Sequence, residues 1–201
     1  YPATRVINKP LMPIYDKPMV YYSLSILIQA GIRDILIITT QRDLIRFKDL
    51  LGDGSAVGCN FSYKIVEGSP GLAISFIVGK EFIGTEKVAL ILGDNLFYGA
   101  QLEEQLEKFT NVEGAVGFAA HVSDPERYGV YEFDDKMNVI SIEEKPNYPK
   151  SKYAVSGLFF CDNEVVKIAN EVKPSVRGEL EITSVLEAYL KMRKLKVQLM
   201  K

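Results

Sequence analysis

The stretch DILIITT, residues 34–40, is short, branched and apolar at both alternating positions. This pattern is typical of a strand in a parallel sheet that is buried on both faces. Residues 43–51, which follow, have helical spacing and stop before Gly52, and glycine is a common helix stop. A buried strand followed closely by a helix predicts an α/β unit.

The same alternation continues along the chain. Apolar runs rich in branched, aromatic or small residues occupy residues 61–66, 87–92, 115–122 and 153–160. Helical spacing recurs in residues 19–30, 71–82 and 101–109. Strands and helices in alternation predict an α/β fold with a mostly parallel sheet and helices on both faces.

The second half of the chain has a different pattern. Strand-like runs at residues 128–133 and 138–144 are joined by the polar link 134–137, which predicts a small antiparallel insertion. Residues 178–193 indicate one amphipathic helix, and residues 195–200 alternate like a final strand. No linker is long enough to split the chain, so we expect a single domain over residues 1–201.

Composition excludes several classes of protein. The 24 Lys and Arg residues against 26 Asp and Glu residues give a net charge of −2, which offers no general attraction for nucleic acid. No apolar stretch approaches the roughly 18 residues that cross a bilayer. Cys59 and Cys161 are too few for a disulfide framework or a thiolate metal cage, so we expect a cytoplasmic protein.

The beginning of the chain has neither an initiator Met nor the basic and apolar regions of a signal peptide. We therefore expect that Tyr1 lies within a longer protein.

Asp94 is the first candidate for chemistry. The apolar run 87–92 leads directly into Gly93 and Asp94, and ligands of open parallel sheets bind outside the carboxyl ends of the strands. Mg²⁺ in proteins is commonly held by one or two carboxylates together with substrate phosphates. The alternative is that Asp94 caps the turn or helix that follows.

Glu143, Glu144 and Lys145 form the second candidate, at the end of a predicted strand and before Pro146. Adjacent strand residues face opposite ways, so Lys145 can reach a phosphate only if the strand has ended or Pro146 bends the chain. The alternative is a solvated charge cluster.

The loops around Lys9 and Lys17 are stiffened by prolines, which favours a fixed cation but is equally typical of a rigid surface loop. His121 is the single histidine, and a structural role is the simpler interpretation. Tyr21 and Tyr22 fall within a predicted helix, where packing explains them better than ligand stacking. The sequence has no P-loop motif.

Eight motifs, in order from residue 1 to residue 183, together resemble the sugar-phosphate nucleotidyltransferases and, within them, the glucose-1-phosphate thymidylyltransferases. They are Y-P-A-T (1–4), K-P-L-M-P-I-Y-D-K-P-M-V-Y-Y (9–22), L-L-G-D-G-S (50–55), L-G-D-N (92–95), D-P-E-R-Y-G-V (124–130), E-E-K-P (143–146), P-K-S-K-Y-A-V-S-G-L (149–158) and R-G-E-L-E-I-T (177–183). The resemblance implies a Rossmann-like nucleotidyltransferase core. It also implies an enzyme that joins dTTP and α-D-glucose 1-phosphate, releases pyrophosphate and makes dTDP-glucose for deoxysugar and rhamnose synthesis.

On the nucleotide side, the resemblance implies that Asp94 is the Mg²⁺ ligand and that Lys9 is a cationic partner of the nucleotide phosphates. Gly71 corresponds to a backbone position next to the base. Val66 stands where the family usually reads the base with Gln, which leaves the preference for thymine over uracil open.

On the sugar side, the resemblance implies that Tyr128, Gly129 and Val155 line the sugar pocket. Glu144 would accept hydrogen bonds from sugar hydroxyls, and Lys145 would grip the phosphate of the sugar phosphate. Lys9 and Lys145 would both act in catalysis by offsetting the repulsion between two anionic substrates.

The family's N-terminal strand with its glycine-rich turn, and its C-terminal W-L-D-T-G-T segment, fall outside the expected core of residues 1–201. The family also implies a homo-oligomer. Two alternatives to a thymidylyltransferase remain open: a catalytically impaired domain that only binds a sugar phosphate, and a uridylyltransferase of the same fold.

Overall fold

The computed structural model describes residues 3–68, 70–98 and 102–200. The chain divides into two compact units, residues 1–68 with 91–108 and residues 69–90 with 109–201. The single core expected over residues 1–201 stays a prediction.

The first unit contains the strand and helix that the opening stretch predicts. Strand β3 (Asp34–Thr39) is followed by helix α2 (Gln41–Leu51), and α2 packs against strand β4 (Asn60–Ile65). β3 and β4 pair in parallel, from Asp34 opposite Asn60 to Thr39 opposite Ile65. The predicted parallel strands at both places are confirmed.

The remaining elements of the first unit are mostly short. They are the 3-10 turns η1 (Ala3–Arg5), η2 (Lys9–Leu11) and η3 (Ser55–Val57), the antiparallel pair β1 (Pro13–Ile14) and β2 (Lys17–Pro18), helix α1 (Met19–Gln29) and, ending at the unit boundary, helix α5 (Leu102–Phe109). α1 confirms the predicted helix and contacts η2 and β2. Gln101, the expected start of α5, lies outside the described residues.

The second unit is built on a mixed sheet, in which β5 (Val88–Ile91) pairs with β9. The strand order is β10, β6, β9, β7 (Gly129–Phe133) and β8 (Val139–Glu144). β10 (Leu195–Leu199) runs parallel to β6 (Ala115–His121), whereas β9 (Tyr153–Cys161) runs antiparallel to β6. The chain between β6 and β9 forms a hairpin and no crossover helix, and antiparallel pairing needs no such crossover. The α/β class is confirmed, and this sheet is mixed.

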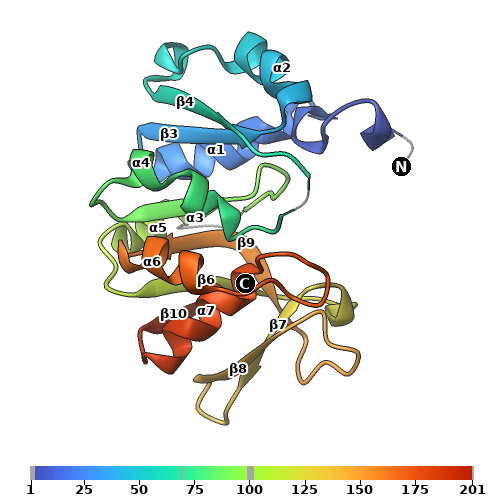
Figure 1. Cartoon of the computed structure of the whole chain (residues 1–201), viewed down its shortest axis with the longest axis vertical. Coiled ribbons are helices and arrows are strands. Elements are labelled where there is room, and N and C mark those ends of the chain that lie inside the picture. The colour runs from blue at the N-terminus through green and yellow to red at the C-terminus, as the bar shows by residue number, and fades with distance from the viewer. Residues whose placement is uncertain (1–2, 69, 99–101, 201) are drawn as a thin grey trace. The chain divides into compact units, whose positions relative to one another are not determined.

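The hairpin of the second unit is the predicted antiparallel insertion. β7 (Gly129–Phe133) pairs with β8 (Val139–Glu144), and both are drawn in yellow and gold in Figure 1. Asp134 stabilises the link, because its Oδ1 accepts hydrogen bonds from the backbone N–H groups of Lys136 and Asn138. The 3-10 turn η4 (Pro125–Arg127) directs the chain into β7.

The helices of the second unit differ most from the expectations. The helix predicted over residues 71–82 is divided into α3 (Ile74–Val78) and α4 (Lys80–Ile83) by Gly79. The helix predicted over residues 178–193 is shorter, α7 (Ile182–Lys191), because the backbone N–H and C=O of Leu180 already bond to Pro70 and Ala73. Helix α6 (Glu164–Glu171), which the sequence analysis missed, packs between α3 and α7.

The core of the second unit contains several fully buried aromatic side chains, namely Tyr131, Tyr189, Phe76, Phe118 and Phe159. Helix α7 contacts β6, β8 and β10, so it covers the sheet beside the hairpin. Within the described ranges, no helix combines the length and the apolar character that crossing a membrane requires.

Tyr131 offers a test of this core, because its buried hydroxyl has no hydrogen-bond partner among the residues that the structure describes. Tyr131→Phe should raise the free energy of unfolding by about 1 kcal/mol, since an unpaired buried polar group is costly. Denaturant unfolding of the variant measures this change. A less stable variant would show that the hydroxyl is satisfied.

Gly117 provides the matched control, because a Cβ there would lie 2.2 Å from the Tyr131 hydroxyl but 3.4 Å from the nearest ring carbon. Gly117→Ala should therefore destabilise the natural chain by about 1–3 kcal/mol. In the Tyr131→Phe background the same change should cost at most about half as much.

Candidate active site

The predicted site residues form one group in each unit, and the group of the first unit surrounds Asp94. The turn after β5 is held by Ser23 of α1, whose hydroxyl donates to the carbonyl oxygens of Leu92 (2.9 Å) and Asn95 (3.0 Å). Pro10 lies against this turn, because a Cβ on Gly93 would be 3.1 Å from Pro10 Cγ. The missing side chain of Gly93 therefore lets the Lys9 segment approach the turn that carries Asp94.

Lys9 and Asp94 are in direct contact, although 85 positions separate them in the sequence. Lys9 Nζ lies 2.8 Å from Asp94 Oδ2, and Asn95 Nδ2 donates to Asp94 Oδ1 over 3.0 Å. No helix follows Asp94 in residues 95–98, so this carboxylate is not a helix cap. The structure thus brings together two of the predicted nucleotide-side residues, Lys9 and Asp94.

The donor set around Asp94 determines which metal could bind. Among the described residues, no group of three or more His, Cys, Asp or Glu side chains could hold a metal ion. The Asp94 side chain is 29% exposed, so its oxygens remain within reach of a ligand. One accessible carboxylate fits Mg²⁺ when substrate phosphates and water supply the other ligands, and it does not fit a cage made of protein alone.

The second group of residues lies at the end of β8. Glu144 is the last residue of β8 and pairs with Gly129, the first residue of β7. Lys145 then leaves the strand with a φ of 44°, and its backbone N–H donates to the carbonyl oxygen of Tyr128 (2.9 Å). The strand has therefore ended before Lys145, which is the condition under which its ammonium can reach a phosphate.

Gly129 explains how the predicted sugar-side residues come together. A Cβ at this position would lie 2.5 Å from Thr183 Cγ2, 3.1 Å from Val155 Cγ2 and 3.3 Å from Glu144 Oε2. Only a residue without a side chain allows the strands β7, β8 and β9 and the helix α7 to approach one another so closely. Gly129, Glu144 and Val155 are thus gathered at one place in the second unit.

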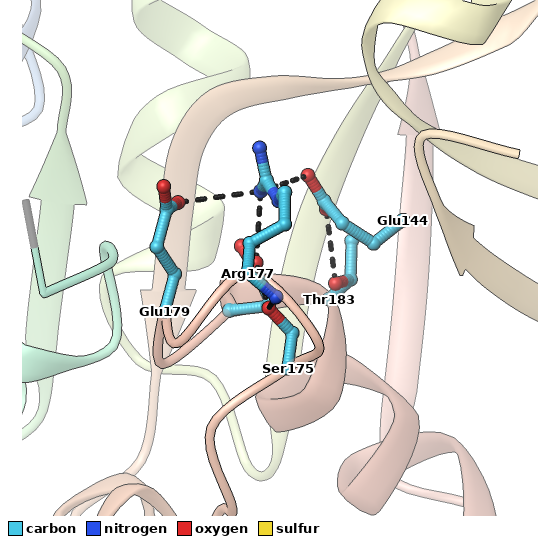
Figure 2. Close-up of polar contacts among 6 residues, drawn as sticks. Glu144, Ser175, Arg177, Glu179 and Thr183 are labelled. Carbon is cyan, nitrogen blue, oxygen red and sulfur yellow. Dashed lines mark hydrogen bonds and ion pairs between the residues drawn. The ribbon is translucent and has the colours of Figure 1, made fainter.

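The Glu144 carboxylate is held from both sides, as Figure 2 shows. Thr183 Oγ1 donates to Glu144 Oε2 over 3.1 Å, and Arg177 Nη2 donates to Glu144 Oε1 over 3.2 Å. Arg177 Nη2 also pairs with Glu179 (3.2 Å) and with Glu181 (2.8 Å). One guanidinium nitrogen therefore binds three carboxylates, and the orientation of Glu144 is fixed.

This network of charged side chains is partly buried. Glu181 is 6% exposed and Thr183 is 5% exposed, and Ser175 donates a further hydrogen bond to Glu181 Oε1 (2.8 Å). Burial raises the pKa of Glu144 above its ordinary value, and the nearby charge of Glu181 raises it further. An oriented carboxylate beside Lys145 can accept hydrogen bonds from hydroxyl groups of a ligand whose phosphate pairs with the lysine.

Sequence analysis missed Arg177, Glu181 and Thr183 as residues of this site. They belong to R-G-E-L-E-I-T, which contributes to the family resemblance, but no role was assigned to that motif. Arg177 and Glu144 are 33 positions apart, so only the motif itself could have indicated the contact.

Gly71 has a local reason to be glycine. Its φ is +91°, and a Cβ there would lie 2.3 Å from the carbonyl oxygen of Leu180. The backbone of Leu180 therefore excludes any side chain at this position, and a contact between Gly71 and the base stays a prediction. Val66 follows β4, and its N–H donates to the carbonyl oxygen of Thr39 (2.8 Å), which places Val66 at the carboxyl end of the β3–β4 pair.

Contacts within the same unit involve the two tyrosines of α1, Lys17 and His121. The Tyr21 and Tyr22 hydroxyls donate to the carbonyl oxygens of Leu50 and Ile14, as expected for packing residues. Lys17 Nζ pairs with Asp16 and lies 4.9 Å from the centre of the Tyr22 ring. His121 makes an edge contact with Tyr153, at the end of β6.

The comparisons with known proteins agree over the whole chain. Residues 1–201 match the family described as nucleotidyl transferase. A glucose-1-phosphate thymidylyltransferase of Neisseria meningitidis serogroup A is 51% identical over 201 residues, which cover 100% of this chain and 70% of that protein. The enzyme of the same name from Mycolicibacterium smegmatis is 51% identical over 200 residues, or 100% of this chain and 69% of that protein.

Solved structures give the same result for the fold. A protein of Bacillus anthracis assigned as a glucose-1-phosphate thymidylyltransferase, in complex with sucrose, is 40% identical with a TM-score of 0.91, over 100% of this chain and 81% of that one. A UDP-glucose pyrophosphorylase complexed with UDP-glucose is 26% identical with a TM-score of 0.83, over 100% of this chain and 85% of that one.

The electrostatics of Glu144 predict a pH-dependent effect on stability. The folded-state pKa is raised above the ordinary value of 4.5, so the buried charge destabilises the fold at neutral pH. Glu144→Gln should therefore raise the thermal unfolding midpoint at pH 7. The gain should shrink as pH falls through the raised pKa toward 4.5, because Glu144 itself then becomes neutral.

Thermal unfolding followed by circular dichroism at pH 7 and pH 4.5 measures this difference. Glu143→Gln is the control, because Glu143 is the exposed neighbour and its replacement should change neither midpoint. If Glu144→Gln instead has a lower midpoint at pH 7, the hydrogen bonds to the Glu144 carboxylate stabilise the fold by more than the burial of its charge destabilises it.

Proposed function

Because this chain belongs to the nucleotidyl transferase family, we propose that it joins dTTP and α-D-glucose 1-phosphate to form dTDP-glucose and pyrophosphate. The observation that carries the proposal is the identity of about half of all residues, over the whole chain, with enzymes named for this reaction. The two groups of side chains supply the chemistry that the two substrates need.

The group at the end of β8 suits the sugar phosphate. Hydroxyl groups of glucose can donate to Glu144, whose orientation Thr183 and Arg177 fix. Lys145 can pair with the phosphate, because a compact ammonium binds phosphate oxygens well. Tyr128, Gly129 and Val155 would line the sugar ring, and the convergence at Gly129 supports this placement.

The group around Asp94 suits the nucleoside triphosphate. Lys9 would bind its phosphates, and Asp94 would hold Mg²⁺ together with them. When bound, Mg²⁺ supplies positive charge that offsets the charge of the phosphates. The contact between Lys9 and Asp94 keeps the lysine where it can meet an anion that arrives at this carboxylate.

The reaction requires positioning more than proton transfer. A phosphate oxygen of glucose 1-phosphate attacks the α-phosphorus of dTTP, and the bond from that phosphorus to the oxygen bridging to the β-phosphorus breaks. Pyrophosphate leaves with the bonding electrons. The attacking oxygen is already ionised, so no general base is needed, and Lys9 and Lys145 offset the repulsion between the two anions.

Val66 can neither donate nor accept a hydrogen bond at the position that the family resemblance gives to the base-reading residue. Uridylyl transfer is not favoured, because the UDP-glucose pyrophosphorylase is 26% identical to this chain whereas the thymidylyltransferase of Neisseria meningitidis is 51% identical. A homo-oligomer and a place in the cytoplasm stay predictions from the family resemblance and the cysteine content.

A direct assay tests the proposal. The full-length protein is incubated with glucose 1-phosphate, Mg²⁺ and either dTTP or UTP, and the products are separated by chromatography. We expect dTDP-glucose and pyrophosphate, with dTTP preferred. Faster formation of UDP-glucose would favour the uridylyltransferase, and binding of glucose 1-phosphate without any product would favour a domain that only binds sugar phosphate.

Asp94→Asn should lower turnover by about 100-fold or more, because it removes the carboxylate charge that holds Mg²⁺. The thermal midpoint should stay nearly unchanged, since Asp94 is partly exposed and outside the core. Steady-state kinetics measure the loss, with Asp49→Asn on the exposed side of α2 as the control. Turnover equal to that of the natural protein would exclude Asp94 as the metal ligand.

Lys145→Ala should weaken binding of glucose 1-phosphate about 10- to 100-fold, because a charge-assisted hydrogen bond contributes roughly 1.5–3 kcal/mol. Binding of dTTP should change much less. Isothermal titration calorimetry measures both affinities. Lys150→Ala is the matched control, since Lys150 follows closely but pairs with Glu132 (2.8 Å), and equal losses for both ligands would count against the role of Lys145.

A further inference from the structure

The segment that leads to Lys9 is tied to the beginning of helix α2. Arg42 Nη2 donates to the carbonyl oxygens of Val6 (2.7 Å) and Arg5 (3.1 Å). Asn8 Nδ2 donates to Asp43 Oδ2 over 2.9 Å. Two consecutive residues of α2 thus hold three residues of the segment, all within the first unit.

Asp43 is a buried charge with a complete set of partners. It is 5% exposed, and besides Asn8 it accepts hydrogen bonds from Thr40 Oγ1 (3.1 Å) and Arg46 Nη1 (3.0 Å). Burial acts to raise the pKa of Asp43, but the hydrogen bonds from Asn8, Thr40 and Arg46 outweigh it and hold the pKa below its ordinary value. Asp43 is therefore ionised at neutral pH, and a charged acceptor forms the stronger hydrogen bonds.

Asn8 connects Asp43 with the turn that contains Lys9. Asn8 directly precedes the turn η2, and its carbonyl oxygen accepts from the N–H of Leu11 (2.9 Å). Pro10 fixes the backbone of the turn on the other side of Lys9. The Lys9 backbone is thus held between Asn8 and Pro10, and from this position its ammonium reaches Asp94.

We propose that Asp43 is a positioning residue, which acts through its hydrogen bond with Asn8 to hold Lys9 beside Asp94. The inference rests on the role given to Lys9 in the proposed function. When the ammonium of a lysine binds a phosphate, both its backbone and its side chain lose conformational entropy. If the backbone is already fixed, only the side-chain rotamers remain to be ordered, so less entropy is lost on binding. Asp43 itself touches neither substrate.

A double-mutant cycle on the full-length protein tests this role. Asn8→Ala removes the link and is preferred to changes at the buried Asp43. It should lower kcat/KM for dTTP about 10-fold and leave KM for glucose 1-phosphate within about twofold. In the Lys9→Met background, the same substitution should lower kcat/KM by less than about twofold, because the side chain that Asn8 positions is already gone.

The control separates positioning from a purely structural role. Tyr21→Phe removes another side-chain hydrogen bond to α2, the one to the carbonyl oxygen of Leu50, and should lower the thermal midpoint without a change in kcat/KM. The inference is overturned if Asn8→Ala leaves kcat/KM for dTTP unchanged. It is also overturned if Asn8→Ala lowers kcat/KM by the same factor in the Lys9→Met background as in the natural protein. Either result leaves the proposed function intact. Full activity of Lys9→Met contradicts instead the role of Lys9 on which the inference rests.

Discussion

The arrangement at the end of the hairpin in the second unit depends on the hydrogen bonds that the side chain of Glu144 accepts. The Glu144 carboxylate is held by Thr183 from helix α7 and by Arg177 from the loop before that helix, so the end of the hairpin, the loop and the helix meet at one charged group. Gly129 makes this meeting possible because it leaves room for Thr183. Burying a carboxylate costs stability, and the raised pKa of Glu144 reflects that cost. In the proposed function, this oriented carboxylate is the acceptor for sugar hydroxyls.

The local patterns of the sequence predicted most elements of this fold. The strand over residues 34–40, its parallel partner and the hairpin of residues 128–144 were predicted because period-2 alternation and polar links are local signals. The ends of helices were less predictable. Leu180 lies within the helix predicted over residues 178–193, but its backbone bonds to Pro70 and Ala73, and such a long-range contact leaves no local signal in the sequence. The antiparallel direction of β9 is likewise set by its partner β6.

Residues of the candidate site were predictable where they end a strand or lie in the turn directly after it. Asp94 and Glu144 both follow this rule, and the structure shows for each the side chains that hold it. Arg177 was not predicted, because a basic residue in a loop is usually solvated and its partner Glu144 is distant in sequence. Asp43 was also missed, since a carboxylate in the first turn of a helix is ordinary, and only its burial and its bond to Asn8 make it unusual.

The crystal structure of the full-length protein with glucose 1-phosphate is the most direct test of the central claim that the end of β8 binds this substrate. We expect sugar hydroxyls within hydrogen-bond distance of the Glu144 carboxylate, the phosphate at Lys145, and the sugar ring against Gly129 and Val155. A sugar phosphate bound elsewhere, with Glu144 contacting only Thr183 and Arg177, would contradict the account.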